Sequence, residues 1–354
     1  MEQIWWERVP NAAAFTTEMI ENLLSEKSII LHCCGDLPWY SYMVNFIKES
    51  VKQQNSSKRF ESIQDVSEPG KYLLKEFCKQ EKRAEYRPSK TYAQFFANSD
   101  DVVLHERYLW VKVTSAEQLE AWTSFVSAYI KERGKNKEVA VFIIEWLGNT
   151  VYQAKKGVKF FSFDEFINEY DRNVFCTLTA SSVREPSLIK KYLTELAVNV
   201  VGNDIELCAA CLQSYKEFLG EPYDVIQTVL DSEIRSNGEA FSFNKTRNDV
   251  DHLIWLAQIK TIYPLLEEYR EDFVQRHSTA IVKQLPIRSS SGEIYQEPRD
   301  VELGTLKYMA DNGQLSLSQK DYESLKKNRD ARNKLSHLAF LNIGEIRELL
   351  KSIY

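Results

Sequence analysis

The sequence has no long apolar segment and no ordered pattern of cysteines. No stretch approaches the roughly 18 consecutive apolar residues of a membrane helix, and the N-terminus MEQIWWERVP lacks a basic region followed by an apolar run. The six cysteines follow no disulfide framework, and the chain is too long to need one. Internal repeats and low-complexity tracts are absent too. We therefore expect reduced thiols, a cytoplasmic location and no contact with a membrane.

The composition that is present is ordinary for a globular protein. Hydrophobic residues make up 44% of the 354 residues and charged residues 27%, which excludes the disordered and fibrous classes. This length predicts two or three domains. The net charge of −6 argues against nucleic-acid binding over the whole surface, so an RNA site would have to be local.

The first half alternates short apolar runs with helical patterns. The runs predict strands, and a helix is expected over residues 116–133 between the second and third of them. The expected strands cover residues 28–34, 108–113, 138–145, 160–163 and 174–179. Residues 52–100 are polar and irregular and support no assignment. The alternation predicts an α/β domain over residues 1–180.

The turn after the first expected strand is the natural place for phosphate binding. A phosphate-binding loop needs close glycines and a Gly-Lys-Ser or Gly-Lys-Thr, but this turn has no lysine and carries Asp36. The neighbours His32, Cys33 and Cys34 cannot all face one metal ion, because side chains alternate along a strand. We therefore expect them to be packed, and we predict no metal and no cofactor.

The third expected strand, EVAVFIIE, is strongly apolar and ends in Glu145. It resembles the Walker B segment of P-loop ATPases. Since the partner motif is missing, residues 1–180 resemble a degenerate P-loop domain of the AAA-like and STAND-like kind. The alternative is that Glu145 simply ends a strand at the surface.

From Pro186 onward the patterns are helical. Residues 181–240 predict a small all-α subdomain comparable to a lid, and the polar residues 235–249 predict a linker. Residues 246–354 predict a second all-α domain.

One helix near the end carries the candidate chemistry. Ser318 can cap it, and no Gly or Pro interrupts residues 319–342. Its apolar arc would contain Ala331, Leu335, Leu338 and Ala339. Arg332 and His337 lie five positions apart, hence roughly 140° apart around the helix, so one copy hardly brings both to one atom. If they act together, two copies of the helix should face each other.

The same helix is locally basic. Residues 326–334 hold five cations and one anion, a local net charge of +4 that suits a phosphate-bearing ligand. The predicted RNA-binding residues are Lys326, Lys327, Arg329 and Lys334.

Arg332, the polar Asn333 and then His337, late in a helix, resemble the signature of the HEPN superfamily over roughly residues 246–354. The resemblance implies a metal-independent endoribonuclease of a prokaryotic defence or toxin-type system, which acts at a homodimer interface. It implies that Arg332 and His337 are catalytic and that Asn333 supports them. Many HEPN domains bind RNA or a protein partner without cutting, so a non-catalytic adaptor or sensor is the alternative. A purely structural role remains open too, with Arg332 solvated beside the core and His337 near a helix end.

Overall fold

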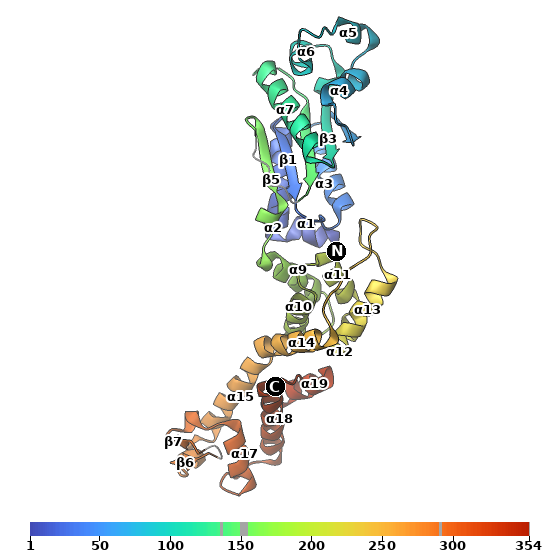
Figure 1. The fold of residues 1–354 in the computed structure, drawn as a ribbon. Helices are drawn as coiled ribbons and strands as arrows, with labels where there is room; N and C mark the ends of the chain where they lie inside the picture. Colours follow the sequence, from blue (N-terminus) through green and yellow to red (C-terminus); the bar gives the residue numbers. More distant parts are fainter. Residues whose placement is uncertain (135–136, 149–154, 290–291, 354) are drawn as a thin grey trace. The chain divides into compact units, whose positions relative to one another are not determined.

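The computed structural model describes residues 1–134, 137–148, 155–289 and 292–353 (Figure 1). The chain divides into two compact units, Met1–Asp171 and Arg172–Tyr354. Each unit is described by itself.

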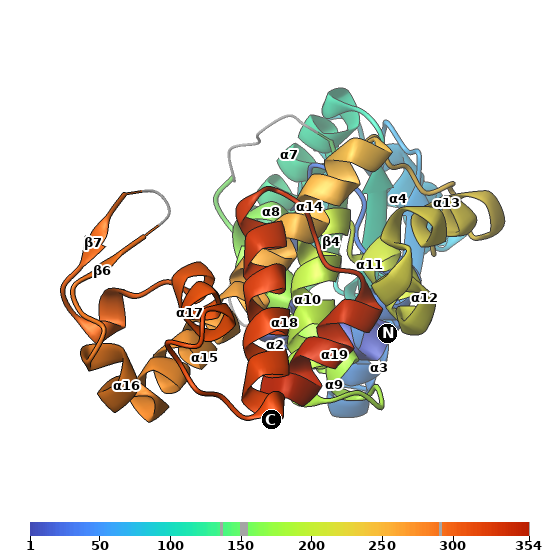
Figure 2. The same ribbon diagram turned by 90° about the horizontal axis from the view of Figure 1, so that it is seen from below.

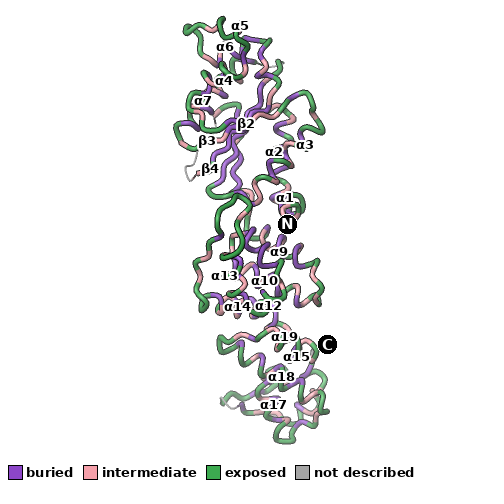
Figure 3. The backbone as a smooth tube through the Cα atoms, turned by 90° about the vertical axis from the view of Figure 1, so that its right-hand side faces the viewer, coloured by how far each residue is buried: buried purple, intermediate pink, exposed green. Residues whose placement is uncertain are grey.

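The first unit is built on a parallel five-stranded sheet, as the α/β prediction requires. Its order is β2-β3-β4-β1-β5, and all four strand pairs are parallel. The strands are β1 (Ser28–Cys33), β2 (Arg59–Gln64), β3 (Arg107–Val113), β4 (Val141–Leu147) and β5 (Val158–Ser162). Figure 3 shows the inner strands β3 and β4 as buried, in agreement with their apolar sequences.

Four of the five expected strands are confirmed, and one is wrong. Residues 174–179 belong to helix α9 (Glu169–Ser181), and the spacing of the buried residues in this segment explains why it forms a helix. Phe175, Cys176, Thr179 and Ala180 are buried, a spacing that fits one face of a helix and not the alternation of a strand. Strand β2, in the region without an assignment, was missed.

Helices cover both faces of the sheet. The longest on one face is α7 (Ala116–Arg133), whose Trp122, Val126 and Tyr129 belong to a core shared with β3, β4 and β1. With it lie α4 (Pro69–Phe77), the short α5 (Gln80–Glu85), α6 (Tyr92–Asn98) and the 3-10 turn η1 (Val103–Glu106). The other face carries α1 (Glu2–Arg8), α2 (Pro10–Leu24), α3 (Tyr40–Gln54) and α8 (Phe163–Phe166). There Phe15 packs on Phe161 and Phe163.

A buried histidine within the first unit predicts a pH-dependent stability. The His105 ring lies 2.7 Å from the Tyr129 hydroxyl and 2.7 Å from the Ser99 carbonyl, and burial lowers its pKa. Below a pH of about 6.5, the pKa of histidine in the unfolded chain, the unfolded chain binds a proton at His105 and the folded chain does not. Stability should therefore fall as pH drops from about 7 to about 5.5, by at most about 1.4 kcal/mol per pH unit from this group.

Urea unfolding at several pH values measures this effect. We expect His105→Gln, which cannot titrate, to flatten the decline, and we expect His252→Gln on the exposed surface to leave it unchanged. Parallel curves for the wild type and His105→Gln would contradict the assignment.

The second unit is helical apart from the hairpin β6 (Ile287–Arg288) and β7 (Ile294–Tyr295). Both expected helical regions, 181–240 and 246–354, lie in this unit. Its helices after α9 are α10 (Ser187–Val201), α11 (Ile205–Gln213), α12 (Tyr215–Gly220), α13 (Pro222–Ser232), α14 (Arg247–Thr261), α15 (Tyr263–Arg276), α16 (Ser278–Val282), the 3-10 turn η2 (Pro298–Asp300), α17 (Leu303–Asp311), α18 (Gln319–Ser336) and α19 (Ile343–Ile353). Figure 2 shows α19 alongside α18, which also contacts α15 and α17. In the described part of the chain, no helix has the length and apolar character needed to cross a membrane.

Candidate functional site

Helix α18 begins where the sequence predicts and ends earlier. The Ser318 hydroxyl accepts a hydrogen bond from the Asp321 amide at 3.1 Å, which confirms the N-cap. The helix does not extend over the whole uninterrupted run of residues 319–342, because its last helical residue is Ser336. Leu338 adopts a left-handed conformation with φ of 60°, and its side chain is 68% exposed instead of joining the apolar arc.

Two side chains of α14 hold the end of α18 in place. The Trp255 indole N–H donates to the Leu335 carbonyl at 2.7 Å. The amide of Gln258, 0% exposed, donates to the Leu341 carbonyl at 2.7 Å and accepts from the Leu341 N–H at 2.8 Å. The turn that carries His337 is therefore anchored on both sides.

The three expected catalytic residues have different surroundings. His337 caps the helix end and is exposed, and no side-chain partner of its ring occurs among the described residues. Arg332 is half-buried, and its guanidinium lies 2.7 Å from a Glu302 carboxylate oxygen and 3.9 Å from a Glu267 oxygen. Asn333 is exposed. Within one copy, Arg332 is therefore engaged with acids while His337 is open to solvent.

Acids from elsewhere in the chain offset the local positive charge. Lys327 pairs with Glu348 at 3.3 Å, and Lys334 pairs with Glu345. Hydrogen bonds from Lys351 and Lys327 lower the pKa of Glu348, so this acid is ionised at neutral pH.

Two further cations of α18, Arg329 and Lys326, differ in their ion pairing. Arg329 pairs with its neighbour Asp330. Lys326 is exposed and has no ion pair in the ranges that the structure covers. The charge of +4 counted along the sequence is thus largely neutralised in space.

Three of the four predicted RNA-binding residues line two hollows beside α18. Lys327 and Lys334 line a hollow of about 220 Å³ beside α19, together with Glu345 and Glu348. Arg329 lines a larger hollow of about 560 Å³ with Asn333. The other residues lining the larger hollow are Arg288, Ser289, Gly304, Thr305, Lys307, Tyr308 and Asp311. Only this second hollow joins a predicted catalytic-site residue to cations and hydroxyl groups.

In the first unit, Glu145 is buried instead of ending a strand at the surface. It is 2% exposed, and its carboxylate accepts hydrogen bonds from the Tyr40 hydroxyl at 2.5 Å and the Trp110 indole at 2.6 Å. The Lys112 ammonium lies 3.7 Å away. Burial, followed by the Glu145 charge, raises the pKa of Tyr40, which keeps its hydroxyl a donor. This acid is committed to internal partners.

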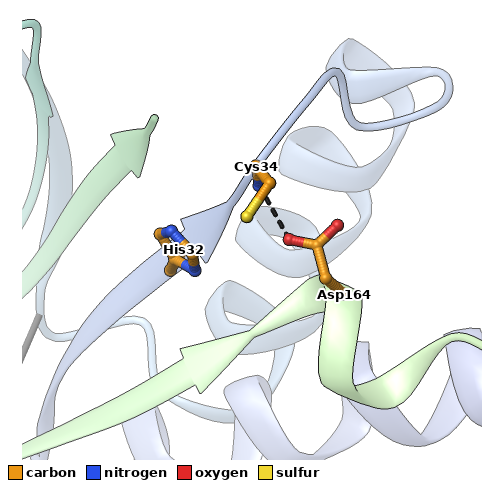
Figure 4. Close-up of side chains that lie close together, drawn as sticks. All are labelled: His32, Cys34 and Asp164. Atoms are coloured by element: carbon orange, nitrogen blue, oxygen red, sulfur yellow. Dashed lines mark hydrogen bonds between the residues drawn. The ribbon is translucent and has the colours of Figure 1, made fainter. Parts of the chain in front are cut away.

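The carboxyl ends of β1 and β5 bring together His32, Cys34 and Asp164, whose ligand atoms lie within 4.8 Å of one another (Figure 4). Cys33, between the first two, is buried in the core, as the alternation along the strand requires. Sequence reasoning set aside three adjacent ligands and missed this set, because Asp164 comes 130 residues after Cys34. The available signal was the His-X-Cys spacing, which places two ligands on one side of a strand.

Comparisons with known proteins add no identification. No protein-family model and no curated protein matches this chain.

Proposed function

We propose that the chain is a metal-independent endoribonuclease of a prokaryotic defence or toxin-type system, acting in the cytoplasm as a homodimer. The observation that carries the proposal is the exposed ring of His337, which has no side-chain partner among the described residues and lies on an anchored turn one helical turn beyond Arg332 and Asn333. An imidazole that is open to solvent is suited to moving protons. The assignment to defence rests on the HEPN resemblance.

The proposed reaction uses the RNA's own 2′-hydroxyl as nucleophile. His337 takes the hydroxyl proton, the oxygen attacks the adjacent phosphorus, and the 5′ oxygen leaves with a proton from solvent. The products are a 2′,3′-cyclic phosphate and a 5′-hydroxyl end. Arg332 of a second copy stabilises the negative charge that develops on the phosphate.

Binding would require cations to exchange a carboxylate for a phosphate. The pairs of Lys327, Arg329 and Lys334 are at least partly exposed. Such pairs contribute only about 0 to 1 kcal/mol, so this exchange costs little. The larger hollow beside Asn333 offers a place for the RNA backbone next to the helix end.

The test is cleavage of single-stranded RNA by the purified chain with EDTA present. We expect His337→Ala and Arg332→Ala each to lower the rate by about a hundredfold or more, because a positioned general base contributes about 10² to 10⁴ in rate. Cleaved ends should carry the cyclic phosphate.

Matched controls separate chemistry from folding. His252→Ala replaces another exposed histidine, and Arg276→Ala breaks the comparable ion pair between α15 and Asp321. Both should keep the wild-type rate. Co-expressed Arg332→Ala and His337→Ala chains should regain part of the activity through mixed dimers. Wild-type cleavage by both single variants would end the proposal.

A non-catalytic adaptor or sensor is the second candidate, and the ion pairs of Arg332 favour it. An arginine between Glu302 and Glu267 can serve packing alone. The turn after β1, with Asp36 and no lysine, also favours a docking role for the first unit. This candidate predicts a dimer without RNA cleavage, and saturable magnesium-dependent ATP hydrolysis would count against it.

A further inference from the structure

The first unit carries a cluster of three metal-ligating side chains at one edge of its sheet. His32 is the fifth residue of β1, Cys34 follows the last residue of that strand, and Asp164 lies in α8 directly after the neighbouring strand β5. Because β1 and β5 are parallel and adjacent, their carboxyl ends meet at this edge (Figure 4). Ligand sites of open parallel sheets form at such ends.

The buried ligand is already oriented as metal-binding histidines are. His32 is 4% exposed, its ring stacks on Phe160, and its Nε2 lies 2.9 Å from the Gly148 carbonyl. A carbonyl can only accept, so Nε2 carries the proton and Nδ1 keeps its lone pair. Metal-bound histidines typically donate their other N–H to such an acceptor. The Ser162 hydroxyl lies 3.3 Å from Nδ1.

The second and third ligands are fixed to each other. The Cys34 backbone N–H donates to one Asp164 carboxylate oxygen at 2.7 Å, and the Cys34 thiol also hydrogen-bonds to this carboxylate, so a bound ion would take the place of the thiol proton. Both side chains are exposed, so they can reorient when an ion binds. Ligand atoms around tetrahedral zinc lie about 3.3 to 3.8 Å apart, so a contraction of about 1 Å from the present arrangement completes the site.

We propose that His32, Cys34 and Asp164 bind one divalent zinc ion through Nδ1, Sγ and a carboxylate oxygen. A thiolate, an imidazole and a carboxylate together suit zinc better than magnesium or calcium, which prefer oxygen ligands. Three protein ligands leave the fourth tetrahedral position to water or another ligand. The loop after β1 and the start of α8 are thereby tied together. This site is separate from the proposed ribonuclease chemistry, which needs no metal.

Metal titration of the tag-free full-length chain, stripped of metal beforehand, tests the site. We expect one equivalent of Zn²⁺ to bind and to raise Tm by roughly 5 °C or more at a zinc concentration about a hundredfold above Kd. One equivalent of Co²⁺ should give a thiolate-to-metal charge-transfer absorption. Neither readout depends on RNA cleavage, so failure of one proposal does not decide the other.

The surface ligands supply variants that should fold. Cys34→Ser and Asp164→Asn should each weaken zinc binding about a hundredfold, and Cys34→Ser should abolish the cobalt absorption. Asp164→Asn retains an oxygen for the Cys34 N–H. Cys33→Ala, which removes the adjacent core thiol, should leave both readouts unchanged. Zinc binding of equal strength in the wild type and Cys34→Ser, or no binding by the wild type, would overturn the proposal.

Discussion

Replacing Gln258 by methionine is expected to lower the free energy of unfolding of the second unit by about 4 kcal/mol. Methionine matches the volume of glutamine but offers none of its strong hydrogen bonds. The Leu341 N–H and carbonyl lose their buried partners, and the Tyr192 hydroxyl loses a donor at 3.1 Å. Each buried polar group left without a partner costs about 1 to 3 kcal/mol, so the Leu341 N–H and carbonyl together cost about 2 to 6 kcal/mol, with a middle value of about 4.

Urea unfolding of the full chain, together with hydrogen exchange of the Leu341 amide, measures the effect. Exchange at Leu341 should accelerate more than exchange in the first unit, because the damage is local to the second. Gln275→Met on the exposed face of α15 is the matched control and should change stability by less than about 0.5 kcal/mol. If the Leu341 amide of Gln258→Met stays as protected from hydrogen exchange as in the wild type, the hydrogen bonds from Gln258 do not hold the residues after α18 in place.

The importance of Gln258 explains why the end of α18 could not be predicted from the sequence. Residues 337–342 include no Gly or Pro, so local propensity continues the helix. The helix ends at Ser336 because Trp255 and Gln258, some 80 residues earlier, form hydrogen bonds with the backbones of Leu335 and Leu341. Tertiary hydrogen bonds outweigh a weak local preference here.

The sheet was more predictable, for a physical reason. Parallel strands covered on both faces read as continuous apolar runs, as in β1 and β4. The exception is β2, an edge strand whose sequence RFESIQ is mostly exposed or half-buried. Such a strand contains no apolar run from which it could be predicted.

The candidate sites show the same limit. Arg332 and His337 could be singled out because their spacing is local. The Glu302, Glu345 and Glu348 carboxylates that offset the cations of α18 could not be assigned to them, since spatial pairing is invisible in a linear count of charge. Asp164 escaped notice because only the pairing of β1 with β5 brings it to Cys34.

The second large effect is expected from replacing Glu145, because a structural role and a catalytic role of this residue predict opposite results. Removing the carboxylate in Glu145→Ala strands the Trp110 N–H and the Tyr40 hydroxyl inside the protein and leaves Lys112 without its nearby charge. We expect the free energy of unfolding of the first unit to fall by about 3 kcal/mol, since bonds to a charged acceptor contribute about 1.5 to 3 kcal/mol each. Glu49→Ala, on the exposed surface of α3, should change it little.

An acid retained for ATP chemistry would behave differently. The polar groups around such an acid would bind the nucleotide. Removing the acid would therefore abolish ATP hydrolysis and leave the fold stable. Glu145 instead has every near neighbour within the fold, and the turn after β1 lacks the lysine that a nucleotide needs. Urea unfolding and an ATPase assay on the same Glu145→Ala preparation therefore distinguish the two roles: lost stability without any ATPase activity to lose marks a structural acid, whereas a stable variant that has lost hydrolysis marks a catalytic one.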